Sequence, residues 1–160
     1  AEEARQAQRQ QEATSTRFRQ KTHQHTMAPT TKTVLLCGGG NAVHVMAALA
    51  SGAGHRVRIL STFADEAARL ANSASERGIT AKCDDGREVT GFLEKVAKDP
   101  AEVAPGCDVV VLAVPAFAHE AYLKAIAPFV DANVTVGAFP GQGGFDTCVR
   151  STLKAPGVVF

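Results

Sequence analysis

Residues Thr33–Val43 read TVLLCGGGNAV, an apolar run followed by three glycines and the beginning of a second apolar segment. The apolar run Thr33–Cys37 is typical of a buried strand, and Asn41–Ser51 is typical of a helix of small and apolar residues. A Gly-x-Gly sequence between a strand and a helix is the setting of a dinucleotide-binding turn. We therefore expect Gly38 to allow the tight turn and Gly40 to let a pyrophosphate approach the backbone. A purely structural turn is the alternative, because turns alone can demand glycine. Val43 also departs from the motif, since Gly or Ala is usual at that position.

Beyond this turn, strand and helix patterns alternate along the chain. Short apolar runs predict strands and longer amphipathic segments predict helices, while Asp84-Asp85-Gly86 between two strand-like segments predicts a hairpin. The expected strands are Arg56–Leu60, Ile79–Cys83, Glu88–Thr90, Val109–Val114, Val134–Phe139 and Val158–Phe160. The expected helices are Asp65–Arg77, His119–Phe129 and Phe145–Leu153, with a short turn or helix at Pro100–Ala104 and with Phe92–Ala97 open between strand and helix.

The segment Val109–Val114 is the strongest strand signal in the chain, because it holds six consecutive apolar residues. A strand without polar alternation is covered on both faces, as in a parallel sheet. Together with the alternation of strands and helices, this predicts an α/β fold with a doubly wound, mostly parallel Rossmann-type sheet and a β-hairpin insertion. Right-handed crossovers then place helices on both faces of that sheet.

The amino-acid composition limits the kinds of function that the chain can have. The chain has 160 residues, 45% hydrophobic and 21% charged, and a formal net charge of +1. These values are typical of a soluble globular domain and favour neither a nucleic-acid partner nor a membrane span. The four cysteines form no C-x-x-C pair, so we expect no metal site, and a reduced, cytoplasmic location is the default interpretation.

Residues Ala1–Thr26 differ in composition from the rest of the chain. They hold six glutamines and five basic residues, and they lack glycine and proline. Such a segment buries too little apolar surface to offset its ordering entropy. We therefore expect residues 1–30 to be a disordered or non-native extension, with a marginal helix over Ala1–Glu12, and residues 31–160 to be the cofactor-binding domain. A transit peptide is disfavoured by its glutamates, and Met27 is a plausible start.

The end of the second expected strand carries no acidic residue. An acid there usually binds the ribose 2′-hydroxyl of NAD. Asp65 comes a few residues later and is better interpreted as the N-cap of the next helix. Ser61 and Thr62 can donate to a ribose hydroxyl or to a 2′-phosphate, and Arg58 more plausibly caps an edge or faces solvent. NAD is the expected cofactor, and these residues do not exclude NADP.

Two loops follow the strongest expected strands, VPAFAH at Val114–His119 and FPGQGG at Phe139–Gly144. Ligands of doubly wound sheets bind outside the carboxyl ends of the strands. We therefore expect Val114, Pro115 and Phe117 to flank the cofactor, although Phe117 is equally well explained as an aromatic at the core edge. A helix start explains His119 better than catalysis does. The Gln142 amide can face a ligand, or it is incidental to a glycine-rich turn.

From about Lys32 onward the chain resembles the amino-terminal domain of the opine dehydrogenases, the octopine dehydrogenases in particular. The resemblance rests on CGGGN at Cys37–Asn41 with His44, on FADEA at Phe63–Ala67 and on VPAFAHE at Val114–Glu120, and it continues through Gln142, Gly144-Phe145 and Cys148-Val149-Arg150. It implies NADH-dependent reductive condensation of an amino acid with a 2-keto acid such as pyruvate. It also implies that Gly38, Gly39, Gly40, Asn41 and His44 form the cofactor loop, and that Gln142 contacts the keto-acid carboxylate.

The resembled family carries its catalytic His and Asp in a second, carboxyl-terminal domain. We therefore assign no catalytic residue to this chain, and we expect the chain to be inactive without that domain as its partner. Two other functions stay open at this point. One is a related NAD(P)-dependent reductase of the glycerol-3-phosphate dehydrogenase or ketopantoate reductase kind, and the other is a nucleotide-sensing domain without chemistry of its own.

Overall fold

The computed structural model describes residues 30–154 and 157–160, without the side chains of residues 75, 76 and 158. The chain divides into two units, residues 1–30 and 31–160. The predictions for the amino-terminal extension, its marginal helix and a start at Met27 lie outside the described residues.

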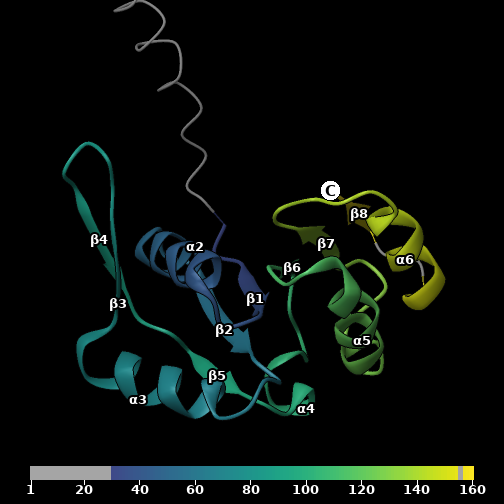
Figure 1. The fold of residues 1–160 in the computed structure, drawn as a ribbon, viewed down its shortest axis with the longest axis horizontal. Helices are drawn as coiled ribbons and strands as arrows, with labels where there is room; N and C mark the ends of the chain where they lie inside the picture. Colours follow the sequence, from purple (N-terminus) through teal and green to yellow (C-terminus); the bar gives the residue numbers. More distant parts are fainter. Residues whose placement is uncertain (1–29, 155–156) are drawn as a thin grey trace, which may run out of the picture. The chain divides into compact units, whose positions relative to one another are not determined.

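One parallel sheet organises the second unit (Figure 1). Its strands are β1 (Thr33–Cys37), β2 (Arg56–Leu60), β5 (Lys95–Ala97), β6 (Val109–Leu112), β7 (Thr135–Ala138) and β8 (Val158–Val159). They lie in the order β5-β2-β1-β6-β7-β8, and all neighbouring pairs are parallel. Counted along the chain within this sheet, that order is the 3-2-1-4-5-6 arrangement of dinucleotide-binding folds. The predicted fold class is therefore confirmed.

The remaining elements cover the two faces of the sheet. They are α2 (Asn41–Gly52), α3 (Glu66–Arg77), α4 (Pro100–Val103), α5 (Ala116–Ile126) and α6 (Phe145–Thr152), with the antiparallel hairpin β3 (Ile79–Lys82) and β4 (Glu88–Gly91). Figure 1 shows α2 and the hairpin on one side and α5 and α6 on the other. The predicted hairpin insertion is present and packs against α2.

Two hydrophobic cores lie on opposite faces, because successive side chains of a strand point to opposite faces. Leu35 and Leu112 belong to the core that contains residues of α4, α5 and α6. Leu36 and Ile59 belong to the core that contains residues of α2, α3 and β3. The half-buried residues Val109 and Val111 pack against this second core, so β6 is covered on both faces, as its apolar run predicts.

Several boundaries differ from the predicted ones. Helix α5 begins at Ala116, three residues before the predicted start at His119, because Pro115 takes the N-cap position and its φ of −59° already suits a helix start. Strand β6 accordingly ends at Leu112 rather than at Val114. The open segment Phe92–Ala97 contains strand β5, which pairs with β2 at the sheet edge.

Arg58 lies on β2 and faces neither solvent nor the carboxyl edge of the sheet. Its guanidinium binds Glu94 through two hydrogen bonds of 3.0 and 3.1 Å and donates to the carbonyl oxygens of Val103 and Pro105. The Arg58 hydrogen bonds hold the pKa of the Glu94 carboxyl below its ordinary value. The solvent-facing interpretation of Arg58 is therefore wrong, and Arg58 caps no edge of the sheet, because β2 lies between β5 and β1. Its side chain instead joins β2 to Glu94 and to the segment around Val103 and Pro105.

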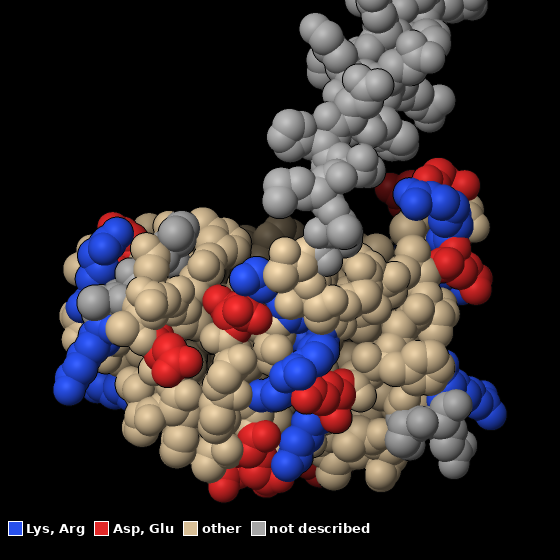
Figure 2. Space-filling model, turned by 180° about the vertical axis from the view of Figure 1, so that it is seen from behind, with Lys and Arg blue, Asp and Glu red and all other residues tan. Residues whose placement is uncertain are grey.

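Charged side chains of both signs lie next to one another on the face drawn in Figure 2. The ion pairs of the sheet region include Lys32–Asp108, Arg56–Glu94 and Lys95–Glu102, all of them exposed. Exposed pairs contribute little to stability. On the face drawn in Figure 2, positive and negative side chains are interspersed, so no large area of that face carries a single sign.

Candidate cofactor-binding site

The three glycines after β1 form the turn that leads into α2. Gly38 has a φ of +121°, a conformation that residues with a side chain rarely adopt. A Cβ added there would lie 2.8 Å from the Ala113 carbonyl oxygen and 3.0 Å from Val114 Cγ1. The Gly38 amide donates to the Leu60 carbonyl oxygen at 2.8 Å, so the turn continues the pairing of β1 with β2. The predicted structural role of Gly38 is therefore present in the fold.

Gly40 is the N-cap of α2 and has a different environment. Its φ of −80° suits any residue, and no atom lies within 4 Å of the position that a Cβ would take. No side chain caps the first turn of α2, and that turn contains no acidic residue. Its first amide groups therefore lack an intrahelical partner, and the positive end of the helix dipole faces outward. These features suit a bound phosphate.

Asn41 and His44 lie on the first turn of α2. Asn41 is exposed, whereas His44 Nδ1 donates to the Gly40 carbonyl oxygen at 3.1 Å. His44 therefore fixes the backbone of the turn at its last glycine. Val43, which departs from the usual small residue, is fully buried against Gly38.

The β6–α5 loop lies next to the glycine turn, because β6 pairs with β1. Val114 contacts Gly38, and Pro115 is exposed. Phe117 is 88% exposed, which rules out the interpretation of this ring as a core-edge aromatic. His119 is buried, its Nε2 donates to the Val114 carbonyl oxygen at 3.1 Å, and its ring packs edge-on against Phe145 at 5.1 Å. His119 therefore has a structural environment, as the sequence favours.

The β7–α6 loop adds Gln142 to the same edge of the sheet. Gln142 is exposed, and its backbone carbonyl oxygen accepts a hydrogen bond from the backbone amide of Phe145 at 3.2 Å. Phe139, directly after β7, is 56% exposed, and Phe63, shortly after β2, is 75% exposed. The carboxyl edge of the sheet therefore presents apolar rings beside the polar glycine turn.

Glu66 is a residue at this edge that sequence reasoning missed. Its carboxylate accepts from Ser61 Oγ at 2.5 Å, and a Cβ added at Gly39 would overlap it. Asp65 occupies the N-cap position as predicted, but its side chain accepts no helix amide and instead lies 3.4 Å from the Arg69 guanidinium. The sequence signal that could have indicated Glu66 is its place in the first turn of the helix that follows β2.

Residues 32–136 match the sequence profile of the family described as NADP oxidoreductase coenzyme F420-dependent. The chain belongs to this oxidoreductase family.

The relatives that the chain matches include an opine dehydrogenase and octopine dehydrogenases. The chain is 43% identical over 130 residues to an opine dehydrogenase of Haliotis discus hannai, covering 76% of this chain and 32% of that protein. Solved structures of octopine dehydrogenase, with NADH and L-arginine or with NADH and pyruvate, match with a TM-score of 0.73. The first of these is 40% identical and is matched over 80% of this chain and 34% of its own length. The chain thus spans about a third of the relatives that it matches.

A ketopantoate reductase of Ralstonia eutropha has the same fold, with a TM-score of 0.64 at 16% identity over 79% of this chain and 39% of its own. That likeness concerns the fold alone. The resemblance inferred from the sequence is confirmed by the more similar proteins, because the matched segment is the amino-terminal NAD-binding region of opine and octopine dehydrogenases.

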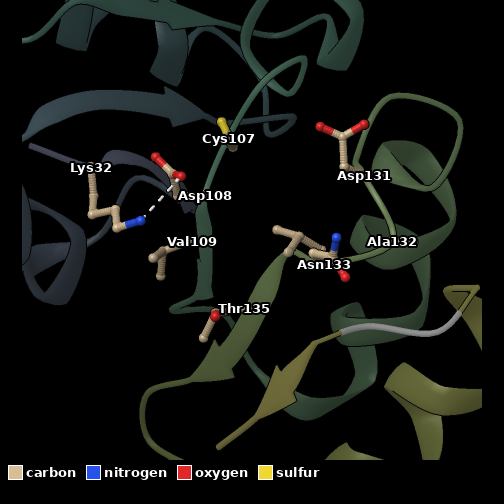
Figure 3. A pocket seen from close by; sticks show the side chains of 9 residues that line it. Lys32, Cys107, Asp108, Val109, Asp131, Ala132, Asn133 and Thr135 are labelled. Atoms are coloured by element: carbon tan, nitrogen blue, oxygen red, sulfur yellow. Dashed lines mark hydrogen bonds and ion pairs between the residues drawn. The ribbon is translucent and has the colours of Figure 1, made fainter. Parts of the chain in front are cut away.

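A pocket of about 600 Å³ lies at the opposite, amino edge of this oxidoreductase sheet. Its lining residues directly precede or begin β1, β6 and β7, and Figure 3 shows Lys32 pointing toward Asp108 across part of it. The Asp108 carboxylate accepts from the Thr33 amide at 2.8 Å and lies 3.4 Å from Lys32 Nζ. The Thr33 amide and Lys32 lower the pKa of Asp108. These groups join the amino ends of β1 and β6, far along the strands from the glycine turn.

In the part of the chain that the structure describes, no three His, Cys, Asp or Glu side chains come together as metal ligands. None of the helices in residues 30–154 and 157–160 combines the length and the apolar character needed to cross a membrane.

Proposed function

We propose that this chain binds NAD(H) with the pyrophosphate at Gly40 and the start of α2. The observation that supports the proposal is that two glycines of the same turn, Gly38 and Gly40, have different surroundings. Gly38 is closed in by backbone and side chains, whereas the position beside Gly40 is open and faces uncapped helix amides. In this proposal the cofactor loop consists of Gly38, Gly39, Gly40, Asn41 and His44.

The neighbouring loops suit the other end of the cofactor. Val114, Pro115 and Phe117 flank the nicotinamide in this proposal, since their loop is next to the glycine turn and Phe117 is free to cover a ring. Gln142 is exposed on the adjacent loop, and in this proposal its side-chain amide contacts the carboxylate of a 2-keto acid. NAD is preferred because the related octopine dehydrogenase structures contain NADH.

The whole protein is proposed to be an opine dehydrogenase. NADH, when bound, supplies the hydride that reduces the imine formed by an amino acid and a 2-keto acid such as pyruvate. Such a reduction also needs a proton donor within hydrogen-bond reach of the reacting nitrogen or oxygen. His119 does not suit that role, because it is buried and its Nε2 is already bonded to Val114. In this proposal the donor lies outside the described residues, across a cleft whose closure excludes water.

The test is a titration of the purified chain with NADH, followed by nicotinamide fluorescence. The chain contains no tryptophan, so protein emission does not interfere. In Gly40→Val two methyl groups occupy the space that the pyrophosphate needs. Loss of one or two hydrogen bonds to a charged group, about 1.5–3 kcal/mol each, weakens NADH binding by a factor of at least about ten.

The matched control is Ala53→Val, which adds the same two methyl groups at the exposed C-cap of the same helix. It should leave NADH affinity unchanged. Far-UV circular dichroism should report a wild-type fold for Gly40→Val, because no protein atom lies within 4 Å of the new Cβ. Equal NADH affinities of wild type and Gly40→Val would remove the glycine turn from the site.

A further inference from the structure

The loop between β2 and α3, residues 61–65, contains a residue with a strained backbone. Ala64 has a φ of +39°, in the left-handed region that residues with a side chain rarely adopt. Such a conformation persists only where the surrounding structure holds the residue in it. The conformation of this loop therefore depends on the groups that bind its backbone.

Two contacts hold the loop on the side of the edge strand β5. The Ser61 amide donates to the carbonyl oxygen of Ala97, the last residue of β5, at 3.1 Å. The exposed side chain of Lys98 donates from its Nζ to the Ala64 carbonyl oxygen at 3.2 Å. Because a lysine side chain is flexible and strongly hydrated, this second contact restrains the loop only weakly.

A third contact comes from the other half of the sheet. Tyr122 lies on α5, which follows β6, and its Oη accepts a hydrogen bond from the Thr62 amide at 3.2 Å. Tyr122 is 7% exposed and belongs to the same hydrophobic core as Leu35 and Leu112. Its hydroxyl is therefore attached to a ring that packing keeps in place. Since β2 and β6 lie on opposite sides of β1, this bond joins the elements that flank the glycine turn.

The loop lies where one half of the cofactor is expected. In doubly wound folds, the adenosine ribose binds at the end of the second strand, which here leads into Thr62 and the 75% exposed Phe63. A loop that already has its bound conformation binds more tightly than one that is ordered by the ligand. The affinity falls in proportion to the fraction of molecules in which the loop is competent.

We propose that Tyr122 is a positioning residue of the cofactor site, whose hydroxyl holds the loop after β2 in the conformation that receives the adenosine half of NAD(H). This inference rests on the cofactor site proposed above and adds a residue that acts through the loop. Without the hydroxyl, the Thr62 amide loses this partner, and Ala64 relaxes toward an ordinary backbone conformation. Fewer molecules then present the loop as the ligand needs it.

The experiment compares the chain with Tyr122→Phe, which keeps the buried ring and removes only the hydroxyl. NADH binding is followed by nicotinamide fluorescence, and ADP-ribose binding by displacement of NADH. Because the two ligands share the adenosine half, both should bind more weakly by the same factor, about threefold to tenfold, as for the loss of one hydrogen bond. Far-UV circular dichroism should report a wild-type fold.

A second substitution separates positioning from a general loss of stability. Glycine adopts a positive φ readily, so Ala64→Gly removes the strain that the hydroxyl opposes. In the Ala64→Gly background, Tyr122→Phe should therefore weaken NADH binding by less than about twofold, because the loop keeps its conformation without the hydroxyl. A merely structural role of Tyr122 would give the same factor in both backgrounds, and that result would overturn the inference.

The matched control is Thr152→Val, which removes one hydroxyl group at nearly constant shape, together with its bond to the Cys148 carbonyl oxygen at the end of α6. It should leave both affinities unchanged. Unchanged affinities in Tyr122→Phe would overturn the role of Tyr122 and leave the cofactor site standing, and so would weaker binding of NADH alone, since the effect would then lie at the nicotinamide half. Binding of neither ligand by the wild type would overturn the cofactor site and this inference together.

Discussion

The glycine turn makes one prediction about stability that separates two residues only two positions apart. Gly38→Ala and Gly40→Ala add the same methyl group to the same turn. At Gly38 the methyl group meets the Ala113 carbonyl oxygen at 2.8 Å and forces alanine to a φ of +121°. At Gly40 it points into open space at a φ of −80°. The two substitutions should therefore differ strongly in their effect on the free energy of unfolding.

The expected magnitudes follow from these environments. Holding a residue with a side chain in a sparsely populated backbone conformation costs about 1–3 kcal/mol, and the contact with a backbone oxygen adds to that figure. We expect Gly38→Ala to lower the free energy of unfolding by about 2–4 kcal/mol. At Gly40, alanine reduces the entropy of the unfolded chain, a gain of about 0.4–1 kcal/mol, and is a poorer N-cap than glycine. The net change should stay below about 1 kcal/mol.

Urea unfolding followed by far-UV circular dichroism measures both changes. With a slope of about 2 kcal/mol per molar urea, Gly38→Ala should shift the midpoint down by about 1–2 M. The Gly40→Ala midpoint should stay within about 0.5 M of wild type by the same slope. Equal midpoints for the two variants would refute the assignment of different roles to the two glycines, whatever the NADH titrations show.

Two further predictions concern groups away from the turn. Because Arg58 lowers the pKa of Glu94 in the folded chain, this pair contributes stability above the ordinary Glu pKa and loses it as pH falls through the lowered value. Arg58→Met should thus destabilise the chain more at pH 7 than at a pH below that range, and a difference from wild type that does not depend on pH would argue against the pair. His119→Ala removes a buried ring, its contact with Phe145 and its bond to Val114. It should lower the free energy of unfolding by about 2–4 kcal/mol in urea titrations, and an unchanged midpoint would mean that the ring is dispensable.

Much of the fold is predictable because the strongest signals in the sequence are local. Strands Thr33–Cys37 and Arg56–Leu60 have the predicted bounds, since each is an apolar or alternating run between glycines or polar turns. The start of α5 was predicted three residues late. The apolar character of the segment before His119 suggested a continuing strand, while the fixed φ of Pro115 starts the helix earlier.

The parts of the candidate site that could be predicted are those whose position depends only on the direction of the strands. Loops that follow neighbouring parallel strands meet at one edge, so Gly38 and Val114 were expected together and are in contact. Glu66 was not predictable in the same way, because its position depends on how α3 docks against Gly39. The sequence interpretation of Asp65 as the nearest acid considered only the distance along the chain, whereas docking brings the next residue to the turn.

The three adjacent glycines also bear on how the sequence can vary. A side chain at position 38 is disfavoured by the backbone conformation, and one at position 39 would overlap the side chain of Glu66. At position 40 no protein atom lies close enough to restrict a side chain. Position 39 is therefore expected to show epistasis: a larger residue there is tolerated only when residue 66 is shortened. Homologues that gain a Cβ at the middle glycine should consequently have lost the long acid at the start of α3. Covariation of this kind is detectable in sequences alone.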